Sequence, residues 1–247
     1  MFENFYIILV EPSNPSNIGS VARAMKNMGF SNLRLVNPVK GITEDSYKLA
    51  SNANDILDNA TIYKNFLSAV GDLNFLIATT ARRGKRRKIY TIKDACSFLT
   101  NLTKSCKIGI IFGREKSGLK NCEIEVCNLI AHIPTNEEYS SLNLAQSVLI
   151  VCYEIFNKFK SFKLTDDEKI YLPEIREKEA FFNRLREFLF EIDYMSESDA
   201  NFKMRGLKRF FNRFFMTKKE MHMLYGVMRQ VRNYQKIIEK RGKIKNE

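Results

Sequence analysis

The chain of 247 residues contains no tryptophan, only two histidines and only five cysteines. His132 and His222 have no partner at the spacing of metal ligands, so neither a histidine-based zinc site nor a Ser-His-Asp triad is expected. The cysteines are odd in number and form no C-x-x-C pair, which argues against a disulfide framework and a zinc knuckle. We expect reduced, mostly buried thiols in a cytoplasmic protein.

Long apolar runs are also absent. No run approaches the roughly 18 residues that a membrane-spanning helix needs. The first residues enter a strand-like segment without a basic region, so a signal peptide is not expected. Apolar residues still make up 45% of the chain, which is enough for a substantial core. The length suits one large domain, or a domain of about 150–170 residues with a smaller appendage.

Acidic residues are scarce in two segments. Lys and Arg together number 40 against 28 Asp and Glu, which gives a net charge of +12. Residues 201–245 hold 14 basic and 2 acidic side chains, and six of the seven residues in 82–88 are cations. Such clusters indicate a polyanionic partner, most often nucleic acid. A solvated surface run is the alternative, and no lipidation signal supports a membrane role.

The hydrophobic pattern changes near residue 165. Up to residue 160, short β-rich runs alternate with helical spacing, which predicts an α/β domain with a mainly parallel sheet. The runs expected to be buried strands are Phe5–Val10, Leu33–Val36, Phe75–Thr80, Ile108–Phe112 and Leu129–Ile133. After a polar stretch that Pro173 interrupts, helices are expected near 174–192, 200–215 and 218–240. The predicted domains are therefore residues 1–165 and 166–247.

Helix ends can be predicted at several points. Apolar residues recur at helical spacing over 18–28, with Asn17 as the expected N-cap and Gly29 after the helix ends. A second long helix is expected over 144–159. The last helix of the appendage opens with Thr217-Lys218-Lys219-Glu220, a capping-box pattern.

One appendage helix has a basic side and an aromatic side. Arg205, Arg209 and Arg213 recur every four residues and therefore share one face, where phosphates can reach them. The other side is occupied by Leu207, Phe210, Phe211 and Phe214. We expect these aromatics in the core rather than as base-stacking platforms.

Three polar loops of the first domain each follow a strand. Residues 11–24 open a helix whose free N–H groups can bind an anion, although capping and a surface arginine would also explain them. Residues 112–119 lack the P-loop spacing, and no G-x-G-x-x-G occurs, so an NTPase is not supported. Residues 133–145 are rich in Ser and Asn; simple capping by Ser140 or Ser141 is the alternative there.

In this order, the three loops resemble the motifs of the SPOUT class of RNA 2′-O-ribose methyltransferases. The matching segments are Asn-Ile-Gly-Ser-Val-Ala-Arg-Ala, Ile-Phe-Gly-Arg-Glu-x-x-Gly-Leu and Ile-Pro-Thr-Asn-x-Glu-Tyr-x-Ser-Leu-Asn-Leu-Ala-Gln. Within the class, the chain is similar to bacterial tRNA (cytidine/uridine-2′-O-)-methyltransferases, whose helical extension resembles residues 207–226. Thr80, where a serine is frequent, and the very basic loop 82–88 are the departures. The resemblance implies a SPOUT-type parallel sheet with a C-terminal trefoil knot, followed by a small all-α domain, in a homodimer.

The resemblance also assigns functional positions. The catalytic positions are Asn17, Arg23, Glu115, Ser141 and Asn143. S-adenosylmethionine (SAM), without a metal, is expected at Thr79, Thr80, Ala81, Gly113, Ile133, Ser140, Ser141 and Leu142. From the charge pattern, RNA contacts are expected at Arg82, Arg83, Arg86, Arg87, Arg205, Arg209 and Arg213.

Chemical roles follow from these positions. Because a guanidinium hardly loses its proton, Arg23 is expected to grip an RNA phosphate and stabilise the developing alkoxide. A phosphate oxygen or water then accepts the proton. Ser141 and Asn143 are expected to orient ribose and cofactor. Glu115 is expected to pair with Arg23 or Arg114.

The resemblance therefore implies SAM-dependent 2′-O-methylation of a cytidine or uridine ribose in the tRNA anticodon loop, at nucleotide 32. Two alternatives remain: an rRNA 2′-O-ribose methyltransferase, and a non-catalytic RNA-binding protein of the same fold. The helical extension argues against the first alternative, and the joint presence of the five catalytic positions argues against the second.

Overall fold

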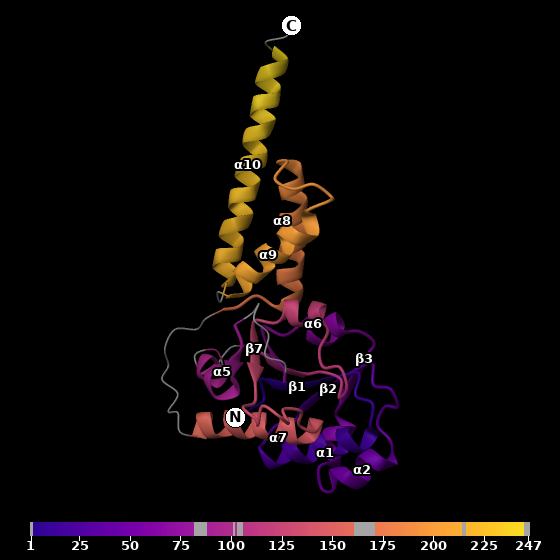
Figure 1. Cartoon of the computed structure of the whole chain (residues 1–247). Helices are drawn as coiled ribbons and strands as arrows, with labels where there is room; N and C mark the ends of the chain where they lie inside the picture. Colours follow the sequence, from indigo (N-terminus) through magenta and orange to yellow (C-terminus); the bar gives the residue numbers. More distant parts are fainter. Residues whose placement is uncertain are drawn as a thin grey trace. The chain divides into compact units, whose positions relative to one another are not determined.

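The computed structural model of the chain describes residues 2–81, 88–100, 102, 106–160, 171–213 and 216–244. The chain forms two compact units (Figure 1). The first unit is Met1–Ile170 with Glu174–Arg176, and the second is Tyr171–Pro173 with Glu177–Glu247. No helix within the described residues is long and apolar enough to cross a bilayer.

The first unit is built on a seven-stranded sheet of order β3-β2-β1-β6-β4-β7-β5, in which all neighbouring strands are parallel. The strands are β1 (Phe5–Val10), β2 (Asn32–Val36), β3 (Thr61–Tyr63), β4 (Phe75–Thr79), β5 (Tyr90–Thr91), β6 (Ile108–Phe112) and β7 (Leu129–His132). The predicted parallel α/β fold and its five strands are confirmed, with ends that differ by one residue at most. The short strands β3 and β5 were not predicted.

Seven helices accompany the sheet in the described part of the first unit. They are α1 (Pro15–Asn27), α2 (Glu44–Ala50), α3 (Asn54–Asp58), α4 (Phe66–Val70), α5 (Ile92–Leu99), α6 (Asn121–Val126) and α7 (Leu144–Lys160). The predicted helices around 18–28 and 144–159 are confirmed as α1 and α7. The cap of α1 is Asn14, whose side chain accepts from the Ser16 N–H, so the predicted N-cap Asn17 is wrong. Proline at the following position, Pro15, starts the helix one turn earlier than the apolar spacing suggested.

Both faces of the sheet are covered, which explains the continuous apolar runs of its strands. Helices α1 and α7 pack against each other below the sheet (Figure 1). On that side Phe2 stacks on Phe30 with ring centroids 4.5 Å apart, and Phe5 meets Phe159 edge to face at 5.8 Å. The other face buries a cluster that includes Ile8 and Val10 of β1 and residues from α4 and α6. All five cysteines are free, and four of them are buried.

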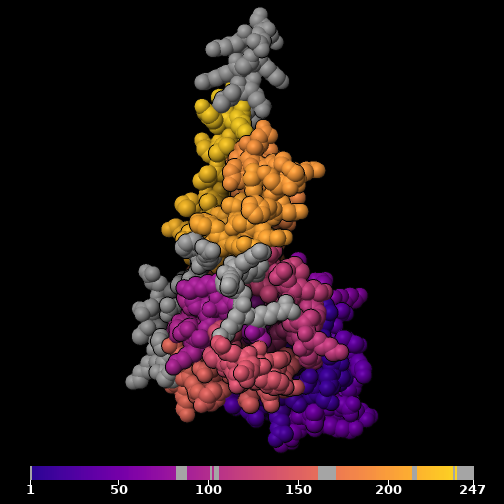
Figure 2. Space-filling view, viewed as in Figure 1, coloured from indigo at the N-terminus to yellow at the C-terminus, as the bar shows by residue number. Residues whose placement is uncertain are grey.

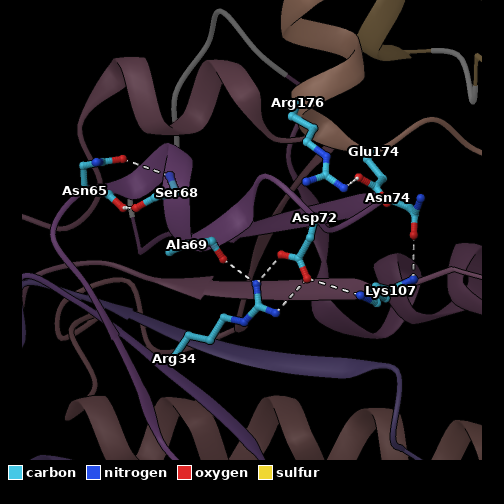
Figure 3. Close-up of polar contacts among 9 residues, drawn as sticks. All are labelled: Arg34, Asn65, Ser68, Ala69, Asp72, Asn74, Lys107, Glu174 and Arg176. Atoms are coloured by element: carbon cyan, nitrogen blue, oxygen red, sulfur yellow. Dashed lines mark hydrogen bonds and ion pairs between the residues drawn. The ribbon is translucent and has the colours of Figure 1, made fainter.

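A buried arginine joins this second face to the loop before β4 (Figure 3). Arg34 on β2 is only 7% exposed and pairs bidentately with Asp72, at 2.6 and 3.0 Å. It also donates to the Ala69 carbonyl at 2.7 Å and lies over the Tyr6 ring, 4.2 Å from its centroid. Lys107 reaches the same Asp72 carboxylate at 3.3 Å. The hydrogen bonds from Arg34 outweigh burial and lower the pKa of Asp72 to about 2. Burial acts to lower the pKa of Arg34, but the Asp72 carboxylate more than offsets burial, so the pKa of Arg34 is raised.

The second unit contains α8 (Ile175–Glu191) from Glu177 onward, α9 (Ala200–Arg213) and α10 (Lys218–Ile244), close to the three helices predicted. Its core is aromatic and methionine-rich, with Phe181 and Phe182 packed beside Met204, Met221 and Met228. Aromatic rings and flexible thioethers fill such a helical core efficiently.

The start of α10 has the predicted capping box. The Thr217 N–H donates to the Glu220 carboxylate at 2.7 Å, and the Glu220 N–H donates back to the Thr217 hydroxyl at 3.2 Å. On α9, Leu207 and Phe211 pack against the core as predicted. Phe210 is 55% exposed, so its predicted core position is wrong. Phe214 lies outside the described residues.

Candidate active site

The sheet topology brings the three predicted loops to one edge. The chain proceeds outward from β1 through β2 to β3, then crosses to β4 on the other side, and β6 later fills the gap between β1 and β4. In parallel sheets, ligands bind beyond the carboxyl ends of the strands where the strand order reverses. The loops after β1, β6 and β7 all start at that edge, so residues far apart in sequence meet there.

A hydrogen-bonded chain of side chains links the three loops. Glu115 accepts from the Ser13 N–H at 3.2 Å and from the Ser13 hydroxyl at 3.1 Å. The Asn17 amide donates to the other Glu115 oxygen at 3.1 Å. The Asn143 amide in turn donates to Asn17 Oδ1 at 3.1 Å. The structure thus brings together Asn17, Glu115 and Asn143, three of the five predicted catalytic residues.

Glu115 is ionised in this arrangement. Burial alone would raise its pKa, but hydrogen bonds from its own backbone N–H, from Asn17 and from Ser13 outweigh burial and lower the pKa below its usual value. Both carboxylate oxygens are occupied as acceptors. The predicted pairing with Arg114 is wrong, and Arg23 donates to neither oxygen in the described contacts, because neutral donors from the first loop occupy the carboxylate.

Arg114 serves a second, more buried network. Its guanidinium donates to both oxygens of Glu11, at 2.7 and 2.5 Å, and to both oxygens of Glu123, at 3.1 and 2.9 Å. The two carboxylates raise the pKa of Arg114, with Glu11 the larger contributor. Glu123 also accepts from the Lys120 N–H at 2.6 Å at the start of α6. This network ties the ends of β1 and β6 to α6.

The loop after β6 depends on two glycines. A Cβ on Gly113 would lie 2.3 Å from the carbonyl carbon of Gly118, so no other residue fits there. Gly118 has a positive φ of 68°, which glycine adopts without strain. The Gly118 N–H donates to the Arg114 carbonyl at 2.8 Å and closes the turn. The glycines make the loop tight enough to present Glu115 to Ser13 and Asn17.

Asn143 has a structural role beside its place in the network. Its Oδ1 accepts from the Ala145 N–H at 2.8 Å, and its carbonyl accepts from the Ser147 N–H at 2.9 Å, so it caps α7. The alternative in which Ser140 or Ser141 caps this helix is therefore wrong. Ser141 is exposed two residues before the cap, where its hydroxyl can meet a ligand.

Arg23 lies apart from the hydrogen-bonded chain. It is exposed on α1, six residues after Asn17 and between the buried Ala22 and Ala24. Over six residues the helix rises about 9 Å between the two Cα atoms, and the described hydrogen bonds do not join Arg23 to Asn17.

The predicted cofactor positions follow three adjacent strands. Thr79 ends β4, Gly113 follows β6, and Ile133 follows β7. The Thr79 hydroxyl donates to the Ile111 carbonyl at 2.8 Å, and the Thr80 N–H donates to the Ala131 carbonyl at 2.9 Å. These bonds fix the carboxyl ends of the strands. The remaining positions, which are exposed or half-buried in the loops, are Ala81, Ser140, Ser141 and Leu142.

The predicted RNA contacts are only partly described. Arg205 and Arg209 are exposed on α9 in the second unit. Arg82, Arg83, Arg86 and Arg87 lie outside the described residues, as does the side chain of Arg213. Within the described residues, no group of three or more His, Cys, Asp or Glu side chains could hold a metal ion.

Sequence reasoning missed Ser13, Glu11 and Glu123. Ser13 precedes the matched segment of the first loop, and its only signal is its place between a strand and a helix. Glu11 comes directly after a buried strand and has a positive φ of 47°, a position where a charged residue is unusual. Glu123 is 6% exposed, which no sequence pattern indicated.

This arrangement can be compared with known proteins. The SpoU rRNA Methylase family matches residues 4–153, which include all three loops and every strand of the sheet. The chain belongs to this family. A second match, to the C-terminal domain of the tRNA methyltransferase TrmJ, covers residues 176–242. The resemblance predicted from the three loops is confirmed.

The SpoU relatives extend over nearly the whole chain. The tRNA (cytidine-2′-O-)-methyltransferase TrmJ of Methanocaldococcus jannaschii is 37% identical, over 87% of this chain and 94% of that protein. The tRNA (cytidine/uridine-2′-O-)-methyltransferase TrmJ of Sodalis glossinidius is 32% identical, over 96% and 94% respectively. The crystal structure of TrmJ from Z. mobilis ZM4 has a TM-score of 0.77 at 32% identity and covers 92% of this chain and 98% of that one.

Proposed function

We propose that the protein transfers a methyl group from SAM to the 2′-hydroxyl of a ribose in tRNA. The observation that carries this proposal is the hydrogen-bonded chain Ser13–Glu115–Asn17–Asn143, which joins the three family loops at the carboxyl edge of the sheet. The TrmJ relatives, which are named as tRNA 2′-O-methyltransferases and align over both units, support tRNA as the substrate.

The residues at the sheet edge fit SAM. None of the eight predicted cofactor positions is charged; they offer backbone groups, hydroxyls and the apolar side chains of Ile133 and Leu142. Such a set suits an adenine ring and a sulfonium cation, because it places no positive charge against the cation. SAM, when bound, supplies a methyl group already activated on sulfur, so the protein needs only to align and to manage a proton.

The polar network acts by positioning. Glu115 holds Ser13 and Asn17, and Asn143 joins Asn17 to the start of α7, so the first and third loops keep a fixed separation. Because the Glu115 carboxylate is ionised and fully engaged, it serves as an anchor rather than as the base. The exposed Ser141 hydroxyl is the group placed to orient the ribose.

Arg23 is the group that meets the RNA. Its guanidinium is exposed on α1 and can grip a phosphate through two parallel N–H donors. The same positive charge stabilises the alkoxide that develops on the ribose oxygen. A phosphate oxygen or a water molecule takes the 2′-hydroxyl proton, because Arg23 itself does not deprotonate.

The proposal includes further features that the resemblance implies. They are a trefoil knot in the C-terminal part of the sheet domain, a homodimer, a cytoplasmic location, a boundary near residue 165 and nucleotide 32 of the anticodon loop as the target. The insertion of β6 between β1 and β4 is compatible with a knot, since a late segment passes between earlier ones.

Incubation of the protein with tRNA and SAM, followed by mass-spectrometric mapping of ribose methylation, tests the proposal. We expect one 2′-O-methylated pyrimidine in the anticodon loop. Methylation of rRNA fragments but not of tRNA would favour the rRNA enzyme. Calorimetry that detects tRNA binding but no SAM binding would favour a non-catalytic RNA-binding protein and overturn the proposal.

A further inference from the structure

The exposed side of α9 carries two neighbouring rows of side chains. The aromatic row consists of Phe202 and Phe210, with Gly206 midway between them at the same four-residue spacing. The arginine row beside it contains Arg205 and Arg209, also four residues apart. Phe202 is 81% exposed and Phe210 is 55% exposed. Both arginines are exposed as well. Exposed apolar side chains that gather in one patch mark interaction sites.

Packing within the second unit leaves much of the aromatic row exposed, although the Phe210 ring meets the Phe211 ring edge to face at 5.4 Å. The opposite side of α9 supplies Ala200 and Met204 to the buried cluster, and Leu207 and Phe211 pack against it. A Cβ at Gly206 would meet no atom within 4 Å, so the surface between the two rings is open. The helix rises about 12 Å over eight residues, which leaves room for a flat group between the rings.

The charge beside the aromatic row indicates which partner fits. Helix α9 contains no Asp or Glu, and residues 201–245 carry a net charge of +12. A second copy of the chain would bring the two arginine rows together across a two-fold axis, and like charges disfavour that arrangement. A partner with flat apolar faces and a negative backbone satisfies both rows at once.

We infer that this face of α9 binds unpaired nucleotides of the RNA substrate, with bases stacked on Phe202 and Phe210 and phosphates against Arg205 and Arg209. Unpaired bases expose their flat faces to aromatic side chains, whereas duplex bases are already stacked on one another. Figure 2 shows the segment that contains α8 and α9 in orange. The inference rests on the proposed function, because it takes RNA as the substrate.

The test compares variants of the full chain by fluorescence anisotropy, with a labelled single-stranded RNA and a matched RNA duplex over a range of salt concentrations. The double variant Phe202→Ala/Phe210→Ala should bind the single strand about tenfold more weakly. Its affinity for the duplex and its salt slope should not change, because no charge is removed. The variant Met223→Ala/Val227→Ala is the matched control, since it removes equally exposed apolar groups from α10 and should bind like the wild type.

The arginine row gives a different signature. The variant Arg205→Ala/Arg209→Ala should lower the salt slope by about two for both RNAs. Wild-type affinity of the aromatic variant, or an equal loss on the duplex, would overturn the inference. A change in its sedimentation would do the same and would assign the aromatic row to a contact between copies.

Failure of the proposed function has a separate readout. If the wild type methylates no tRNA while the aromatic variant still loses single-strand affinity selectively, the enzymatic proposal fails and the RNA-binding face remains. If the wild type methylates tRNA and the aromatic variant binds RNA normally, the enzymatic proposal stands and the inference about the α9 face fails. With both correct, the aromatic variant should show a raised KM for tRNA and an unchanged kcat at saturating tRNA.

Discussion

The two units of the chain differ in how they arrange their polar groups. In the first unit, carboxylates, amides and a hydroxyl from residues about 100 positions apart are paired with one another at the edge of a parallel sheet. In the second unit, three helices enclose phenylalanines and methionines, and the exposed Arg205 and Arg209 lie on α9 beside ion pairs such as Lys208–Glu179. Hydrogen-bonded pairs fix the positions of side chains relative to one another. Exposed cations attract a polyanion but do not fix its position.

This difference fits a division of labour between alignment and capture. A methyl transfer needs groups held within a fraction of an ångström, which loops anchored on a sheet provide. Recognition of an RNA backbone tolerates much looser placement, because its largest contribution is electrostatic. We therefore expect changes in the first unit to alter kcat and changes in the second to alter RNA affinity, as the following predictions specify.

The largest effect is expected from Arg23, an exposed arginine on α1 of the first unit. Arg23→Ala should lower kcat by about 100-fold or more while SAM affinity, measured by calorimetry, stays near that of the wild type. Arg23→Lys keeps the charge but loses the planar fork and should rescue poorly. Lys26→Ala on the same helix is the control and should retain activity. Near-normal turnover of Arg23→Lys would show that a point charge suffices.

The next effect concerns the ion pair between the buried Arg34 on β2 and Asp72 in the loop before β4. Asp72→Asn leaves the Arg34 guanidinium buried without a counter-charge and should destabilise the fold by about 2–3 kcal/mol. Urea unfolding followed by circular dichroism measures this loss. Asp55→Asn, which breaks an exposed pair with Lys26, is the control and should cost well under 1 kcal/mol. Equal losses in the two variants would mean that burial of Arg34 contributes nothing.

Removal of the second unit should separate capture from alignment. A chain ending at Arg176 should bind tRNA at least tenfold more weakly, with a smaller salt slope, and should still bind SAM. The end point matters, because Ile175 is buried in the core of the first unit and its N–H donates to the Leu73 carbonyl at 2.8 Å. A chain ending at residue 165 should therefore be less stable. Sedimentation should be measured for both, and an unchanged salt slope would move RNA binding to residues 82–88.

The smallest effect is a pH dependence of stability. The pKa of Asp72 is about 2 in the folded protein against 3.8 as a free side chain, so the folded state favours the ionised form. The resulting stabilisation is complete above about pH 4 and is lost as the pH falls toward 2. Urea midpoints measured between pH 5 and pH 2.5 should fall more steeply for the wild type than for Asp72→Asn. Parallel curves would contradict the assignment.

Much of the fold was predictable because its central strands are buried on both faces. A short continuous apolar run such as 108–112 predicts a strand that is buried on both faces. The strands β3 and β5 have three and two residues, and Ile62 in β3 is exposed, so they carry no such signal. Five-residue helices such as α3 and α4 are too short for helical periodicity to appear.

Part of the polar network at the sheet edge was predictable from the sequence, but Ser13, Glu11, Glu123 and the pairings were not. The family resemblance assigned Asn17, Glu115 and Asn143, yet which donors reach Glu115 depends on how loops about 100 residues apart converge. Glu115 and Arg114 are adjacent in sequence but do not pair with each other. Glu115 contacts Ser13 and Asn17, whereas Arg114 contacts two other carboxylates. Phe210 was misplaced for a related reason: a helical pattern indicates an apolar residue, but only tertiary contacts decide whether that residue is covered.

The central position of β6 has a consequence for biosynthesis. Strand β1 ends at Val10, but the neighbour that joins it to β4 is not made until Phe112 leaves the ribosome. At about 5–20 residues per second, the edge of β1 that β6 later covers stays unpaired for roughly 5–20 s, and the edge of β4 for roughly 2–7 s. These strands are among the most apolar segments of the protein, and unpaired apolar edges invite aggregation. The cell must therefore protect the first hundred residues during translation, long before a methyl group or an RNA is bound.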